Sequence, residues 1–424
     1  MNAKELIAAL QGGALNKYSA LYENVEESTE RIIKAIRAFE ASYGGERDIS
    51  VFSVPGRSEI IGNHTDHNNG KVMAGAINRD IIAVASRNND EMIRFRSEGY
   101  YEEKISLADV NSPDNFKKFT SRALVAGMAH AFSKAGHAIG GYDAYSCTEV
   151  LKGSGLSSSA AFEVTVGNIL NHLYNGGSVD NKEIAKYAQF SENVYFGKPC
   201  GLMDQMACAV GGFVYIDFED NQHPVVESVD FSLSDAGYAL CIVNTGGNHA
   251  NLNDDYASVP AEMKAVAEHF GKETLRGLTE ADIVGAALEL RSKVGDRAIL
   301  RALHFLRENN RVVLASDALK GKELDRFLEI ITASGRSSFQ YLQNVYTTQN
   351  VGEQGLSLAL AVTDGALSGK NAAFRVHGGG FAGTIQAFVK KEDLADYVKL
   401  IDSVFGEGSA MPLNIRPAGA IRLF

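Results

Sequence analysis

Residues 153–161 read GSGLSSSAA, and a helical pattern of apolar residues follows them over 162–173. The pattern predicts a helix that ends at the glycine pair 176–177. Because glycines let backbone amides come close to a ligand and the amino end of a helix attracts negative charge, the stretch is typical of an anion-binding loop. A plain loop in which Ser157 or Ser158 caps the helix explains it equally well. The stretch alone therefore does not identify a ligand.

The sequence excludes three common kinds of phosphate-binding or catalytic motif. No Gly-Lys pair in the chain is followed by Ser or Thr, as a Walker phosphate loop requires. A nucleophile elbow needs glycine at position 159, which is serine here. The HRD and DFG triplets of protein kinases do not occur in the sequence, so any phosphate chemistry uses another scaffold.

The composition describes a protein large enough for more than one folded unit. With 424 residues, of which 45% are hydrophobic, the chain can form two domains, which we expect over 1–215 and 216–424. A net charge of -11 leaves no strong positive field, so a nucleic-acid partner is not expected. The sequence does not indicate an oligomeric state.

Several features favour a cytoplasmic protein. The amino-terminal residues lack the basic-then-apolar order of an export signal, and no apolar stretch approaches the ~20 residues of a membrane-spanning helix. The four cysteines show no CxxC spacing and suit free thiols, which fits a reducing compartment. We therefore expect neither export nor a membrane partner.

Helical and β-type patterns alternate along the chain, which predicts a mixed α+β architecture. Apolar residues at helical spacing predict helices over 27–43, 182–194, 261–270 and 298–306. Short β-rich runs predict strands over 49–54, 80–86, 142–150, 211–218, 238–243 and 384–390. The segment 56–70, rich in Gly and Asn, is expected to be a loop. No long linker separates the halves, so we expect the domains to share an interface with a cleft.

Residues 55–68 read PGRSEIIGNHTDHN and form a dense polar segment. Their guanidinium, amide, imidazole and carboxylate groups suit the recognition of a polyhydroxyl ligand. His64, Asp66 and His67 could also ligate a metal, but a solvated or locally hydrogen-bonded turn explains them better.

A third motif, CGLMDQ at 200–205, places Asp204 among glycine and apolar residues. Aspartate in such a position commonly caps a helix. It could instead orient or deprotonate a hydroxyl, with a neighbouring guanidinium to keep it ionised and to stabilise phosphoryl charge. The motif alone does not decide between these roles.

A fourth motif, FRVHGGGFAG at 374–383, is a strand-like run that breaks into three glycines. Glycines there permit close approach of the backbone to a ligand. Taken in isolation, a tight turn in a sheet is the simpler interpretation.

Taken in their order along the chain (55–68, 153–161, 200–205 and 374–383), the four motifs resemble those of the GHMP small-molecule kinase family and, within it, the galactokinases. The similarity extends through RENNRV at 307–312 and ASGRSSFQ at 333–340, so it covers nearly the whole chain. The resemblance implies a two-lobed α+β fold with the active site in the cleft between the lobes. It also implies transfer of the terminal phosphate of ATP to the anomeric hydroxyl of galactose.

The resemblance assigns the phosphoryl-transfer roles to particular residues. Asp204 would be the base or orienting carboxylate, and Arg57 would pair with it and stabilise the transferring group. The side chains of such a pair should approach within hydrogen-bonding or short ionic range, about 3 to 5 Å. Mg²⁺ would be held by hard oxygen ligands, Ser159 and Glu192. Backbone amides of the loop would hold the nucleotide phosphates, and these belong to Gly153, Ser154, Gly155, Leu156, Ser157 and Ser158.

On the sugar side the resemblance is less complete. The implied sugar contacts are Asn63, His64, Asp66, Gly201 and Tyr256. Asn63 stands where galactokinases usually have Glu, Glu59 where they usually have Asn, and His67 where they usually have Tyr. A kinase for another sugar, such as N-acetylgalactosamine or arabinose, is therefore an alternative. A second alternative is a non-catalytic sugar sensor built on the same fold.

Overall fold

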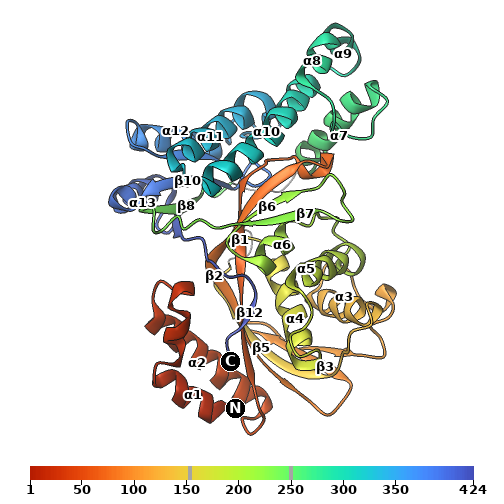
Figure 1. Cartoon of the computed structure of the whole chain (residues 1–424), viewed down its shortest axis with the longest axis vertical. Coiled ribbons are helices and arrows are strands. Elements are labelled where there is room, and N and C mark those ends of the chain that lie inside the picture. The colour runs from red at the N-terminus through yellow and green to blue at the C-terminus, as the bar shows by residue number, and fades with distance from the viewer. Residues whose placement is uncertain (151–154, 248–251) are drawn as a thin grey trace.

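The computed structural model describes residues 1–150, 155–247 and 252–424, and within them the chain forms two β-sheets covered by helices (Figure 1). This arrangement confirms the expected α+β class. The molecule is elongated, and the N- and C-termini lie close together near one end (Figure 1). No helix of the described ranges is both long and apolar enough to cross a membrane.

The first sheet has eight strands among the described residues, six of them in the order β12-β1-β2-β5-β3-β4, while β6 pairs with β2 and β7 with β6. Their bounds are β1 Ser50–Ile61, β2 Lys71–Arg87, β3 Met92–Ser97, β4 Glu103–Ser106, β5 Tyr142–Thr148, β6 Phe213–Asp217, β7 Val225–Val229 and β12 Ile421–Arg422. Long antiparallel pairing of β1 with β2 forms its centre. The last strand, β12, returns to pair with β1, so the carboxyl-terminal end of the chain is part of this sheet.

Alternation along the central strands buries both faces of this sheet. Val51 and Ile82 belong to a core that includes α1 (Ala3–Gln11) and α2 (Val25–Tyr43). Their neighbours Phe52 and Ala83 belong instead to the core under the helices of the opposite face. Successive side chains of a strand point to opposite faces of a sheet. Apolar residues therefore occupy the positions that face each of the two cores. The helices of that opposite face are α3 (Ser121–Lys134), α4 (Ser158–Tyr174), α5 (Asn181–Phe190) and α6 (Met203–Val210).

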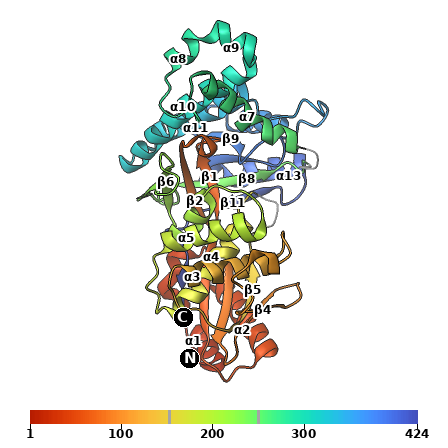
Figure 2. The same ribbon diagram turned by 90° about the vertical axis from the view of Figure 1, so that its right-hand side faces the viewer.

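The second sheet has the order β11-β8-β10-β9. Its strands are β8 Tyr238–Asn244, β9 Ala373–His377, β10 Thr384–Lys390 and β11 Ala410–Leu413. One face packs against α12 (Gly355–Leu367) and α13 (Lys391–Phe405). The other face lies toward α10 (Asp296–Lys320) and α11 (Leu324–Ser337). The helices α7 (Asn253–His269), α8 (Glu280–Gly285) and α9 (Ala287–Lys293) pack around α10 at the far end of the molecule (Figure 2).

Most of the expected helices and strands are present, but the loop expected over 56–70 is shorter. β1 continues through Ile61, so Arg57 and Glu59 lie in a buried strand rather than in a loop. The chain leaves the strand at Gly62, whose φ is 113°. The expectation was wrong because these polar residues find hydrogen-bonding partners inside the protein and can therefore be buried.

The expected division into domains at residues 215 and 216 falls inside β6. β7 and β12 also belong to the first sheet, although both lie in the second half of the chain. The division into 1–215 and 216–424 therefore stays a proposal.

A buried ion cluster fastens the carboxyl-terminal segment to the first sheet. Arg416 and Asp80 are each 1% exposed, and their side chains lie 3.1 Å apart. Asp80 also pairs with Arg31 of α2 and accepts a hydrogen bond from Ser53. Removing one partner of such a pair leaves a buried charge without compensation, which is strongly destabilising.

The variant Arg416→Ala is therefore expected to lower the free energy of unfolding by about 3–5 kcal/mol. Arg326→Ala is the matched control, because Arg326 pairs with Glu323 at 2.8 Å while both side chains are about half exposed. Loss of this surface pair should cost less than about 1 kcal/mol. Urea denaturation of both variants measures the difference, and equal losses would contradict the role given to the cluster.

Candidate active site

Arg57 and Asp204, which lie far apart in the sequence, form an ion pair. The Arg57 Nε donates to Asp204 Oδ1 at 2.7 Å, and Nη2 lies 2.6 Å from the same oxygen. Arg57 comes from the middle of β1, and Asp204 from the first turn of α6. The expected approach of these two side chains is confirmed.

The surroundings of Asp204 favour its ionised form. Burial opposes ionisation, but the charge of Arg57 and hydrogen bonds from Ser157 and Arg57 outweigh it and lower the pKa of Asp204 below its ordinary value. The amino end of α6 carries partial positive charge that also favours a carboxylate there. About a third of the Asp204 side chain (33%) is exposed, so a ligand can reach it.

The loop over 155–158 lies directly against this pair. Arg57 Nη1 donates to the Gly155 carbonyl at 2.5 Å, and the Arg57 amide donates to the Leu156 carbonyl at 3.1 Å. Ser157 donates its hydroxyl to Asp204 Oδ2 at 2.5 Å. Gly153 and Ser154, also expected in the phosphate loop, lie outside the described residues.

Ser157 precedes α4 but does not cap it. Its backbone is left-handed, with φ 58° and ψ 55°, and its side chain makes no capping hydrogen bond. The first amides of a helix have no partners within the helix, and Ser158 opens α4. Unpaired amides at the start of a 17-residue helix suit a phosphate group.

Ser159, in the first turn of α4, and Glu192 form a second polar cluster. The Ser159 hydroxyl donates to Glu192 at 3.2 Å, and the amide of Gln205 donates to the other Glu192 oxygen at 2.8 Å. Glu192 lies on a π-helical turn, η4 (Ser191–Phe196), that follows α5. Lys198 also approaches Glu192, at 3.4 Å.

Two buried oxygens near this cluster have no hydrogen-bonding partner among the described residues, namely Oε1 of Glu163 and Oε1 of Gln205. Burial and the charge of Glu192 raise the pKa of Glu163 well above its ordinary value. Hydroxyl, carboxylate and amide oxygens are ligands that fit Mg²⁺. No group of three or more His, Cys, Asp or Glu side chains with metal-binding geometry occurs in the described part of the chain, so an ion here would take further ligands from a bound substrate.

The residues expected on the sugar side form two small groups. A side chain at position 201 would approach Asp66 Oδ2 to 3.0 Å, so Gly201 faces that carboxylate directly. The His64 ring donates to the Gly379 carbonyl at 2.9 Å, and the Tyr256 hydroxyl donates to the Gly380 carbonyl at 2.9 Å. His64 and Tyr256 therefore contact the glycine motif 378–380, whereas Asp66 faces the segment before α6.

Burial lowers the pKa of His64 to about 3, so its ring is neutral near pH 7. A neutral ring that donates from one nitrogen presents an acceptor on the other. Such a group can bind a hydroxyl but adds no positive charge to the site.

Asn63 is held by protein groups. Its amide nitrogen donates to the Glu59 carboxylate at 3.2 Å and to the Gly378 carbonyl at 2.5 Å. Its amide oxygen accepts from Asn344 at 2.6 Å. Glu59 in turn pairs with Arg375 at 3.2 Å. Asn63 therefore fastens the start of the 62–70 loop to the glycine motif.

The sequence indicated no role for His377, which is the last residue of β9 and whose ring faces β1 of the first sheet. Its ring contacts the Ser58 hydroxyl at 3.1 Å and the Thr384 hydroxyl at 2.8 Å. A side chain at position 155 would lie 3.3 Å from the same ring, so His377 also limits the space behind the phosphate loop. Its place directly before three glycines was the one signal that could have drawn attention to it.

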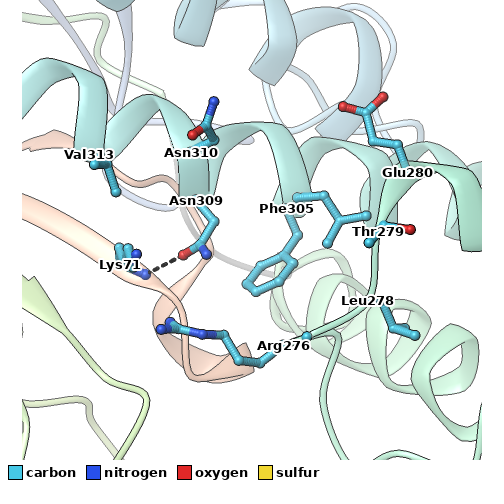
Figure 3. A pocket seen from close by; sticks show the side chains of 11 residues that line it. Lys71, Arg276, Leu278, Thr279, Glu280, Phe305, Asn309, Asn310 and Val313 are labelled. Atoms are coloured by element: carbon cyan, nitrogen blue, oxygen red, sulfur yellow. Dashed lines mark hydrogen bonds between the residues drawn. The ribbon is translucent and has the colours of Figure 1, made fainter.

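A cavity of about 380 Å³ lies between α10, the start of β2 and residues 276–280 (Figure 3). Phe305 and Asn309 of α10 project into it beside Lys71, whose amide donates to Asn309 at 2.7 Å. Arg276 lines the cavity and donates to the Asn69 carbonyl at 2.8 Å, which connects the cavity with the 62–70 loop. It does not include Arg57 or Asp204 among its lining residues.

Two family models match this chain. Residues 37–87 match the galactokinase galactose-binding signature, and residues 123–212 match the amino-terminal domain of GHMP kinases. The first range contains Arg57 and the 62–70 loop, and the second contains the described phosphate loop and Asp204.

Two galactokinases from other organisms match most of this chain. A galactokinase of Streptomyces coelicolor is 31% identical over 374 residues, which cover 87% of this chain and 91% of the relative. A galactokinase of Streptococcus thermophilus is 30% identical over 372 residues, which cover 87% of this chain and 92% of the relative.

Solved structures show the same fold. The structure of Lactococcus lactis galactokinase complexed with galactose has a TM-score of 0.76 at 24% identity and covers 91% of this chain and 98% of that chain. A mevalonate kinase has a TM-score of 0.60 at 14% identity and covers 87% of this chain and 99% of that chain. These matches confirm the expected GHMP kinase fold. With relatives 30–31% identical along most of its length, this chain belongs to the galactokinase family of GHMP kinases.

Proposed function

We propose that this protein is an ATP-dependent galactokinase that phosphorylates the anomeric hydroxyl of galactose to give galactose 1-phosphate. The observation that carries the proposal is the Arg57 and Asp204 pair, which lies against the loop over 155–158. Family membership supplies the sugar and the nucleotide. Four cysteines that form no disulfide fit action in the cytoplasm.

In this mechanism Asp204 orients the sugar hydroxyl and accepts its proton as the bond from oxygen to the terminal phosphorus forms and the bond from that phosphorus to ADP, the leaving group, breaks. Its lowered pKa keeps it ionised at neutral pH, so it can accept a hydrogen bond from the hydroxyl. Arg57 keeps the carboxylate in place and presents its remaining donors to the phosphoryl oxygens. Since phosphoryl transfer depends mainly on positioning and charge stabilisation, no covalent intermediate with the protein is required.

We further propose that Ser159 and Glu192 hold Mg²⁺ when nucleotide is bound. Their 3.2 Å contact and the partnerless oxygen of Gln205 support this assignment. The ion would neutralise charge on the ATP phosphates. The amides at the start of α4 would bind phosphate oxygens in the same complex.

Galactose would be held by His64, Asp66, Gly201 and Tyr256. Asp66 and the neutral ring of His64 can accept hydrogen bonds from sugar hydroxyls. The absence of a side chain at Gly201 leaves room beside Asp66. Asn63 would act on the sugar mainly by fixing this loop, because its amide already bonds Glu59, Gly378 and Asn344.

A kinase for N-acetylgalactosamine or arabinose remains the nearest alternative, because the Glu59 and Asn63 pair departs from the usual residues of the family. The sensor alternative is less favoured, because the Arg57 and Asp204 pair and the Ser159 and Glu192 contact are both formed. A sensor would bind sugar and ATP without releasing ADP.

The variant Asp204→Asn should release ADP about 10²–10⁴-fold more slowly than the unaltered protein with galactose and Mg-ATP. The amide keeps the shape of the side chain but cannot accept the hydroxyl proton. Asp204→Glu restores a carboxylate at a longer reach and should recover part of the rate. Nucleotide affinity, measured by calorimetry, should change little, and a decrease in rate below tenfold would contradict the role of Asp204.

The exchange variant Glu59→Asn/Asn63→Glu tests the loop pair. It keeps one amide and one carboxylate in contact but moves the negative charge from β1 to the 62–70 loop. We expect the KM for galactose to change by at least about tenfold, because a carboxylate at position 63 changes the hydrogen bonds available to the sugar. The KM for ATP should stay the same, because the nucleotide side of the site is unaltered.

Each single substitution is the control for this exchange. Glu59→Asn or Asn63→Glu alone breaks the pair and should lower kcat/KM more than the exchange does. An exchange variant whose KM for galactose, N-acetylgalactosamine and arabinose equals that of the unaltered protein would show that the pair has no part in sugar choice.

A further inference from the structure

The second oxygen of Asp204 is not free in this structure. Oδ1 is bound by Arg57, and Oδ2 accepts the Ser157 hydroxyl at 2.5 Å. Under the proposed function, the acceptor hydroxyl of the sugar must lie between Asp204 and a phosphate held by the loop over 155–158. The Ser157 hydroxyl fills the same side of Oδ2, the side that faces the loop.

Ser157, which makes this contact, has an unfavourable backbone conformation. A left-handed φ of 58° is uncommon for serine. In the usual arrangement a serine before a helix turns its hydroxyl toward the helix amides, but here that bond is not formed. The same side chain therefore has two alternative partners, Asp204 or the amino end of α4.

A second contact connects this arrangement with the nucleotide. Arg57 Nη1 donates to the Gly155 carbonyl at 2.5 Å and so holds the loop against the ion pair. A phosphate oxygen carries more negative charge than a carbonyl and is the stronger acceptor for a guanidinium. A phosphate that binds Arg57 therefore competes with Gly155 and weakens the hold on the loop that carries Ser157.

We propose that Ser157 is a positioning residue whose hydroxyl occupies the acceptor side of Asp204 until nucleotide binds and draws the loop away. This inference rests on the proposed function, because the place that Ser157 fills is the one assigned to the sugar hydroxyl. It follows that nucleotide strengthens sugar binding. By reciprocity of linked equilibria, sugar strengthens nucleotide binding by the same factor.

Calorimetric titration of galactose into the full-length protein, with and without a non-hydrolysable ATP analogue and Mg²⁺, tests the inference. For the unaltered protein we expect the Kd for galactose to fall about tenfold when the analogue is bound, since a hydrogen bond to a charged group is displaced beforehand. In Ser157→Ala the hydroxyl is absent. Its Kd without analogue should approach the value with analogue, so the ratio of the two falls toward one.

Two further variants separate the hydroxyl from the backbone. Ser157→Gly also lacks the hydroxyl but accepts a left-handed φ without strain, so it should lose the tenfold ratio as Ser157→Ala does. Ser292→Ala removes an exposed hydroxyl that donates to the Glu289 carbonyl within α9, away from the site, so it should keep the ratio. A ratio that survives in Ser157→Ala, or one that is absent from the unaltered protein, would overturn the inference.

Failure of the proposed function has a different appearance. If the unaltered protein neither binds nor phosphorylates galactose under either condition, both the proposed function and this inference are overturned. If galactose is bound and phosphorylated but Ser157→Ala behaves like the unaltered protein in every titration, only the inference about Ser157 fails.

Discussion

The ion pair between Arg57 and Asp204 is the interaction on which the rest of the site depends. It joins residues 147 positions apart, and Arg57 also donates to the carbonyl of Gly155, which is 98 positions from it in the sequence. One guanidinium thus fixes the central strand β1, the start of α6 and the phosphate loop relative to one another. An arginine suits this place because its planar group can donate in several directions at once.

Arg57 is held in place in turn because its strand is fastened by the second sheet. The Ile60 carbonyl, three residues further along β1, accepts from Arg375 at 3.0 Å and from Gln386 at 2.8 Å. The Gly62 amide donates to Glu308 of α10 at 3.2 Å. Burial alone would raise the pKa of Glu308, but Arg311 and other nearby positive groups lower it to about 2, so it remains an acceptor. The 62–70 loop and the Arg57–Asp204 pair are thereby fixed by residues from both halves of the chain.

The sequence could predict the parts of this site but not their contacts. The order of four motifs identified the family, and helical spacing predicted α2 and the first part of α10, because both signals are local along the chain. The end of β1 was missed because Arg57 and Glu59 give a strand the polarity of a loop. They can be buried only through Asp204 and Arg375, which no local pattern connects with them.

The same limit applies to the contacts of Asn63 and Ser157. Resemblance gave each a role by position, whereas the structure gives each a set of partners: Glu59 and Asn344 for one, Asp204 for the other. Such partners depend on how two sheets pack, which is a property of the whole fold. The roles of these residues in catalysis are still proposals, and they can be separated by measurement.

The central claim is that Arg57 and Asp204 act as one unit in phosphoryl transfer. A double-mutant cycle on kcat, with Arg57→Ala, Asp204→Ala and the double variant at saturating galactose and Mg-ATP, tests it most directly. Residues that act as a unit have strongly non-additive effects, so the double variant should be about as slow as the slower single variant. Losses in the two single variants that multiply in the double variant would show that the residues act independently, and would contradict the account.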